Sequence, residues 1–212
     1  MRIARFLSVA ALVAAPAFAV EPSHVPIDED RGRAVQCLAT AIAYEAGFES
    51  VEGQQAVAEV ILNRLRNPNF PKTVCGVVFA GSERRTGCQF SFTCDGSLKR
   101  RLPDTVLART RSVAEAAIDG INPMRAPGAT HYHADYVSPY WAPSLVRVMK
   151  IGAHIFYRLP ALVDQGSIMR AYRPVGEPLI DALGPMSRST SGSIAQPDAS
   201  ASATFAPWGL AP

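Results

Sequence analysis

The stretch Leu38-Ala39-Thr40-Ala41-Ile42-Ala43-Tyr44-Glu45-Ala46-Gly47 decides the fold of this chain of 212 residues. Leu38, Ala41, Ile42 and Glu45 share one face at helical spacing, so a carboxylate closes an apolar stripe. Burying a carboxylate is costly, and desolvation raises its pKa. Glu45 is therefore a candidate general acid near neutral pH. The alternative is a glutamate at a helix end that bonds to nearby backbone.

The beginning of the chain predicts a secretory signal peptide at residues 1–19. Arg2 and Arg5 supply a positive start, residues 6–15 are apolar, and residues 17–19 fit a small-x-small cleavage pattern. The apolar run is too short for a comfortable membrane span, and no second long apolar segment follows. We expect an exported protein, periplasmic or secreted, without a transmembrane segment after cleavage.

The remaining chain predicts one folded domain between two extensions. We expect a linker at 20–33, a catalytic domain at 34–158, and a flexible tail rich in Pro, Ser and Ala at 159–212, because such a tail buries little apolar surface. The formal net charge of +3 is small. Within residues 35–158, Lys and Arg number 14 against 10 Asp and Glu, and this balance of +4 suits an anionic polymer as partner without calling for nucleic acid.

Export changes the interpretation of the four cysteines, which are Cys37, Cys75, Cys88 and Cys94. An even set in an oxidising compartment predicts two disulfides rather than metal ligation. Four cysteines allow three pairings, and the sequence does not decide among them. We favour Cys88 with Cys94, closing a tight loop, and Cys37 with Cys75, tying two helices.

The hydrophobic pattern predicts an α+β domain that is mostly helical, with a small β element. Helices are expected at 34–45, 51–66, 73–79, 104–119 (with Asp104 as N-cap), and from Pro143 through Phe156. Two segments alternate like strands, 88–94 and 129–134. No internal repeat is visible.

Matching motifs run in order through residues 37–158. They are AIAYEA at 41–46, Glu49, GQQAVAEVILNR at 53–64, FPKTV at 70–74, CQFS at 88–91, ATHY at 129–132, Trp141 and IGAHIFY at 151–157. In these motifs the chain resembles the cell wall hydrolase family that includes the catalytic domains of spore cortex-lytic enzymes. The resemblance implies a compact lysozyme-like fold that cleaves the glycan strands of peptidoglycan, with Glu45 matching the family's catalytic glutamate. No metal or other cofactor is expected.

One motif departs from the family. The family usually reads Glu-Ala-Arg-Gly-Glu, whereas this chain has Glu45-Ala46-Gly47-Phe48-Glu49. The acid is retained, but any role of the arginine beside it is lost.

A hydrolase normally adds a second carboxylate. Glu49 would follow Glu45 by one turn, but Gly47 is expected to interrupt the helix, and Asp95 fits a turn residue better than an acid. The sequence therefore favours a lytic transglycosylase, in which the substrate's own 6-hydroxyl attacks the anomeric carbon and one carboxyl group serves as acid and then base. A two-carboxylate muramidase-type hydrolase is the alternative.

Other motif residues are candidates for the cleft. We expect Gln89, Phe90 and Ser91 to hold N-acetyl sugars, and His131 and Tyr132 to lie near the reacting sugar. Trp141 either stacks on sugar or covers the core. Asn63 is expected to make a structural hydrogen bond, and His154 to be a core histidine in an apolar helix.

Two further functions compete with glycan cleavage. His131 and His133 alternate along a possible strand, and with His154 they give the ligand types of a metal-dependent murein amidase or peptidase. No zinc motif bearing a glutamate accompanies them. An inactive peptidoglycan-binding module would explain the altered arginine, but it predicts that the acid is lost, whereas Glu45 is present.

Overall fold

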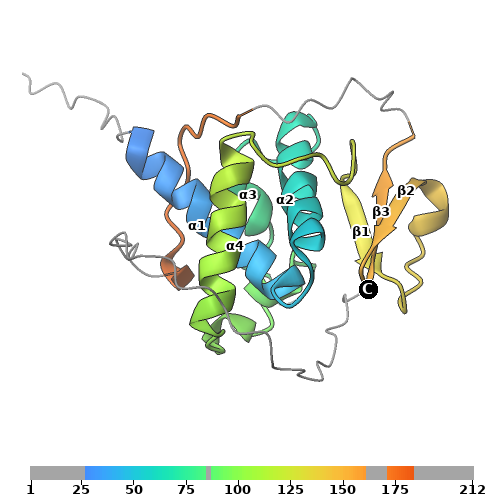
Figure 1. The fold of residues 1–212 in the computed structure, drawn as a ribbon, viewed down its shortest axis with the longest axis horizontal. Coiled ribbons are helices and arrows are strands. Elements are labelled where there is room, and N and C mark those ends of the chain that lie inside the picture. Colours follow the sequence, from blue (N-terminus) through green and yellow to red (C-terminus); the bar gives the residue numbers. More distant parts are fainter. Residues whose placement is uncertain (1–26, 85–86, 161–170, 184–212) are drawn as a thin grey trace, which may run out of the picture.

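The computed structural model describes residues 27–84, 87–160 and 171–183. In these ranges a layer of helices stands beside a small antiparallel sheet (Figure 1). The helices are α1 (Ile27–Ala46), α2 (Val51–Arg66), α3 (Val74–Val78) and α4 (Asp104–Ile118), and the strands are β1 (His131–Ala134), β2 (Val146–Ile151) and β3 (His154–Arg158). The predicted class, α+β and mostly helical, is confirmed. The predicted signal peptide and the Ser-rich end of the tail lie outside the described residues.

Helix α1 is the centre of the helical layer and packs against α2, α3 and α4. Its apolar stripe is fully buried, as Leu38 and Ile42 show, and so are Val57 and Ile61 of α2. The disulfide between Cys37 and Cys75 ties α1 to α3, which is the pairing that the sequence favoured. None of the helices in the described ranges has both the length and the apolarity that crossing a membrane requires.

The helix ends follow local capping chemistry. Helix α1 ends at Ala46, before Gly47, and α2 starts after Ser50, whose side chain accepts a hydrogen bond from the Gly53 N–H. The predicted bounds of α2 are confirmed. Helix α1 begins at Ile27, earlier than expected, and Pro103 precedes α4, so the prediction of Asp104 as its N-cap is wrong.

The helix predicted after Pro143 is wrong, because this segment forms the hairpin of β2 and β3. Ile151 pairs with His154, which leaves Gly152 and Ala153 as a two-residue turn. Gly152 has a φ of +55°, which favours glycine, and half of the residues of β2 are β-branched. The extended segment predicted at 129–134 is confirmed for residues 131–134, which form β1, and β1 pairs with β3 in the order β1-β3-β2.

The strand predicted at 88–94 is also wrong. Ser91–Thr93 is a single 3-10 turn, and the Cys94 N–H donates to the Ser91 carbonyl. The disulfide between Cys88 and Cys94, the second favoured pairing, closes the loop around this turn. Phe92 is buried in the core at this turn, so the aromatic residues that suggested a strand serve packing instead.

Polar residues of α2 hold the segment that leads into β1. The Glu59 carboxylate accepts two backbone N–H groups, and Asn63 and Arg64 donate to two carbonyls, all within residues 125–130. The predicted structural hydrogen bond of Asn63 is thereby confirmed, at 2.9 Å from the Ala129 carbonyl. These four bonds fix where β1 starts, and so where its side chains meet α1.

Residues 171–183, which the sequence placed in the tail, pack on the helices. Buried Glu177 accepts hydrogen bonds of 2.8 and 2.9 Å from the first two N–H groups of α3. Asp30 of α1 accepts 2.8 and 3.0 Å bonds from the N–H groups of Gly176 and Glu177. Single acidic residues, rather than an apolar pattern, anchor this segment, and periodicity does not detect them.

Candidate active site

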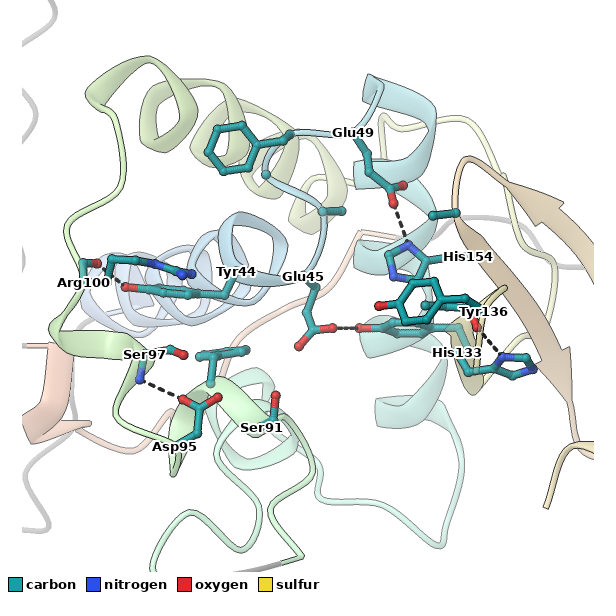
Figure 2. A pocket seen from close by; sticks show the side chains of 17 residues that line it. Tyr44, Glu45, Glu49, Ser91, Asp95, Ser97, Arg100, His133, Tyr136 and His154 are labelled. Atoms are coloured by element: carbon teal, nitrogen blue, oxygen red, sulfur yellow. Dashed lines mark hydrogen bonds and ion pairs between the residues drawn. The ribbon is translucent and has the colours of Figure 1, made fainter. Parts of the chain in front are cut away.

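A cleft lies where the end of α1 faces the sheet and the loop at residues 88–100. It consists of two hollows, of about 320 and 480 Å³, that both include Glu45 and Tyr132 in their walls. The first hollow is the one seen in Figure 2, with Glu45 directed between the loop that carries Ser91 and Asp95 and the strands that carry His133 and His154. Glu45 thus stands at the point where the two halves of the cleft meet.

Glu45 is placed by the last turn of α1 and is partly buried. The hydroxyl of Tyr132, from β1, donates a hydrogen bond of 3.0 Å to Glu45 Oε2. Burial, followed by the nearby Glu45 charge, raises the pKa of Tyr132 well above 10. The phenol therefore stays protonated and remains a donor to the carboxyl group.

The environment of Glu45 favours its protonated form. Burial is the largest effect and raises its pKa, and the nearby negative charge of Asp95 acts in the same direction. The hydrogen bond from Tyr132 and the positive charges of His154 and Arg64 oppose it, but the net direction is upward. A carboxyl group held in this way can carry a transferable proton nearer to neutral pH than an exposed glutamate.

Arg64 is a site residue to which the sequence gave no role. It lies on α2, is 4% exposed, lines the second hollow, and donates from Nε to the Thr130 carbonyl at 2.8 Å. Its guanidinium carbon lies 5.4 Å from the ring centroid of Phe70 and 5.3 Å from that of Phe90. Burial lowers its pKa to about 10, so the side chain is still a cation at neutral pH. The sequence did contain a signal for Arg64, because a charged residue on the buried face of a helix is unusual.

Glu49 and His154 meet beside the first hollow, in a contact that is an ion pair when the histidine ring is protonated. Glu49 Oε1 lies 3.0 Å from His154 Nδ1 (Figure 2). The prediction that His154 sits in an apolar helix is wrong, because it begins strand β3. Glu49 points to this histidine and does not continue the helix beyond Glu45, because α1 has already ended at Ala46. The expected interruption of the helix is therefore confirmed.

The structure places the six predicted sugar-binding residues around the cleft. Ser91 lines the first hollow, Tyr132 lines both, and the second hollow is lined by Gln89, Phe90, His131 and Trp141. Phe90 is only 3% exposed and packs against Phe92, so most of its ring belongs to the core. Their roles toward sugar remain proposals.

The histidines of β1 meet a single tryptophan. The Trp141 ring contacts the rings of His131 and His133, with centroids 5.4 and 5.6 Å apart. His133 Nε2 lies 2.9 Å from the Tyr157 hydroxyl, and its Nδ1 lies 2.8 Å from the Ala134 carbonyl. Burial lowers the pKa of His131 to about 4, so its ring is neutral at neutral pH. Trp141 thus both packs on the sheet and lines the cleft.

Asp95 stabilises a turn and also lines the cleft. Its Oδ1 accepts a hydrogen bond of 2.7 Å from the Ser97 N–H, as a turn residue would. The same residue lines the first hollow opposite Glu45 (Figure 2). Its negative charge contributes to the raised pKa of Glu45.

Gly47 stands where the family usually has an arginine, and the packing around it leaves no room for a side chain. A Cβ added at Gly47 would overlap the Ala43 carbonyl oxygen and lie 2.9 Å from Val106 Cγ1. An arginine at this position would therefore clash with the Ala43 carbonyl of α1 and crowd Val106 of α4. Arg109 of α4 instead donates from Nη2 to the Gly47 carbonyl. A cation thus approaches this turn from another helix.

A partly buried glutamate in a cleft lined by aromatic, amide and hydroxyl groups is typical of sites that bind glycans. Residues 48–157 match the model of the Cell Wall Hydrolase family, and the chain belongs to this family.

Among curated relatives, the spore cortex-lytic enzyme of Halalkalibacterium halodurans is 37% identical over 123 residues, covering 58% of this chain and 34% of the relative. That of Bacillus subtilis (strain 168) is 33% identical over 122 residues, covering 58% and 36%. The chain thus spans about a third of the length of these two relatives. A solved catalytic domain of the germination-specific lytic transglycosylase SleB from Bacillus anthracis is 30% identical. The match has a TM-score of 0.45 and covers 59% of this chain and 94% of that one.

Proposed function

We propose that this protein cleaves the glycan strands of peptidoglycan as a lytic transglycosylase, with Glu45 as its single acid and base. The observation that carries the proposal is the state of Glu45. It is a glutamate whose pKa is raised by burial, at the junction of two halves of a cleft, held by the phenol of Tyr132. Membership of the Cell Wall Hydrolase family supports peptidoglycan as the substrate.

The reaction needs one proton to travel out and back. Protonated Glu45 gives its proton to the glycosidic oxygen, and the bond from that oxygen to the anomeric carbon breaks. The 6-hydroxyl of the same sugar then attacks the anomeric carbon, and its proton returns to the Glu45 carboxylate. The product is a 1,6-anhydro sugar, and the enzyme is regenerated. During the charged stage, the Tyr132 hydroxyl stabilises the carboxylate through its hydrogen bond.

The walls of the cleft suit N-acetylated sugars. Gln89 and Ser91 offer an amide and a hydroxyl for acetamido and hydroxyl groups, and Trp141 offers a ring face for stacking. The cleft continues on both sides of Glu45, so a strand can place its scissile bond over the carboxyl group with sugars on either side.

A second candidate is a two-carboxylate hydrolase that uses Asp95. Asp95 lines the same hollow as Glu45, and such an enzyme needs two carboxylates in one cleft. Its hydrogen bond to the Ser97 N–H gives it a structural task as well. The metal-dependent alternative has less support, because both ring nitrogens of His133 already lie at hydrogen-bond distance from protein oxygens.

Mass spectrometry of fragments released from purified peptidoglycan separates these functions. Transglycosylation leaves anhydro-muramic ends, which are lighter by one water than the reducing ends left by a hydrolase. An amidase or peptidase releases peptides, and a binding module releases nothing. Anhydro ends support the proposal, and any of the other three outcomes contradicts it.

We also infer that the protein is exported. The leader-like residues 1–19 indicate secretion, and the two disulfides fit an oxidising compartment such as the periplasm. Fractionation of cells, followed by N-terminal sequencing of the mature protein, tests this. A mature chain that starts at Val20 outside the cytoplasm is the expected result.

A further inference from the structure

Glu49 is held by a cradle of two glycines. A Cβ at Gly53 of α2 would lie 2.5 Å from Glu49 Oε2, and a Cβ at Gly152 in the β2–β3 turn would lie 2.9 Å from the same atom. Both distances are shorter than atoms tolerate, so a side chain at either position would displace the carboxylate. The fold therefore keeps space for this group from a helix and from a hairpin at once.

Glu49 is partly exposed, but one of its carboxylate oxygens is buried. Within the described residues, Oε2 is buried and has no hydrogen-bond partner. Leaving a buried acceptor unsatisfied lowers stability, and an unsatisfied group of this kind in a native structure calls for an explanation. The other oxygen, Oε1, lies 3.0 Å from His154 Nδ1, which is itself buried without a hydrogen-bond partner among the described residues.

From His154 a chain of contacts leads to Glu45. The ring of His154 meets the ring of Tyr132 edge-on, with centroids 5.1 Å apart and planes at 83°. Tyr132 is 9% exposed, and its ring also packs against Phe156. Its hydroxyl ends at Glu45 Oε2. Because the neighbours of the Tyr132 ring set the direction of its hydroxyl, they also set the orientation of the Glu45 carboxyl group.

We propose that Glu49 is a positioning residue that acts on Glu45 through His154 and Tyr132. The proposal rests on the proposed function of Glu45. In this proposal the charge of Glu49 does not act directly on Glu45, although the two residues are only four positions apart in the sequence. The charges that act on Glu45 include those of His154, Arg64 and Asp95, while Glu49 acts on Tyr132.

The variant Glu49→Gln tests the first step, because glutamine fits the same cradle but cannot form the ion pair with His154. We expect kcat on purified peptidoglycan to fall about 10- to 100-fold with KM unchanged, since misplacing a catalytic group by about 1 Å costs on this scale. His154→Gln should give the same loss, and it serves if Glu49→Gln does not fold. The matched control is Glu115→Gln, which breaks the ion pair with Arg111 on α4 and should change neither constant.

The second step is tested by a double-mutant cycle with Tyr132→Phe. If Glu49 acts through Tyr132, Glu49→Gln should lower kcat less than about 2-fold in the Tyr132→Phe background. Losses that multiply, an unchanged kcat in folded Glu49→Gln, or a change in KM alone would overturn the proposal. Glu45→Gln is measured alongside. An active Glu45→Gln variant would refute the proposed function, whereas an inactive Glu45→Gln with a normal Glu49→Gln would refute only the positioning role.

Discussion

Replacing Tyr132 by phenylalanine removes one atom that touches the candidate acid. The lost hydroxyl donates the 3.0 Å hydrogen bond to Glu45 Oε2, while the rest of the ring keeps its contacts with His154 and Phe156. This bond favours the ionised carboxylate, so it opposes the effect of burial on the Glu45 pKa. Without it, the Glu45 pKa must rise further.

The size of the change follows from the type of bond. A hydrogen bond to a charged group contributes about 1.5–3 kcal/mol, and one pKa unit corresponds to about 1.4 kcal/mol. Tyr132 is 9% exposed, so water screens the bond little. A hydrogen bond to the protonated carboxyl group contributes about 0.5–1.5 kcal/mol, so only the difference of about 1–1.5 kcal/mol shifts the pKa, and we expect the Glu45 pKa to rise by about one unit. Because the first step needs protonated Glu45, activity on the alkaline side should persist to a pH higher by this amount.

The assay is the pH dependence of kcat/KM for release of soluble fragments from purified peptidoglycan. The matched control is Tyr136→Phe, the same chemical change at another residue that lines the first hollow. We expect its alkaline limb to coincide with that of the parent protein. An alkaline limb of Tyr132→Phe that stays in place, or that moves to lower pH, would refute the role assigned to this hydrogen bond.

Two further predictions concern the second acid and the disulfides. If Glu45 acts alone, Asp95→Asn should keep most of the activity, and a chelator should not change the rate. Loss of activity in folded Asp95→Asn, with ordinary reducing ends, would favour the two-carboxylate hydrolase, and recovery with zinc after chelation would favour the metal-dependent alternative. Oxidised protein should weigh four hydrogens less than reduced protein, because both disulfides are formed. Reduction should lower the free energy of unfolding by about 2–5 kcal/mol per bridge, measured by denaturant titration, and four thiols in protein isolated from the periplasm would contradict this.

Local signals in the sequence were sufficient for the helical half of the fold. Apolar periodicity located α1, α2 and α4, and Gly47 and Ser50 mark the boundary between the first two. The hairpin was missed because an apolar run such as 145–156 fits helix and strand about equally well. What decides it is the pairing of β3 between β1 and β2, a contact between distant segments that periodicity does not contain.

In the candidate site, too, the sequence predicts the features that depend on local pattern and misses those that depend on contacts between distant segments. Glu45 was predicted because a carboxylate within an apolar stripe is a local anomaly. The link from Glu49 to His154 was not predicted, because it joins the loop before α2 to a residue of the missed hairpin. Arg64 was overlooked for a related reason, since its task depends on Thr130 and on two aromatic rings from other segments.

Activity of Glu45→Gln tests the central claim most directly. Glutamine keeps the size of the side chain and can still accept the Tyr132 hydrogen bond, but it has no proton to transfer. We predict that release of fragments from purified peptidoglycan falls by at least about 10²-fold, the scale of general acid–base catalysis, while thermal melting shows a folded protein. Near-normal release by a folded Glu45→Gln variant would contradict the account.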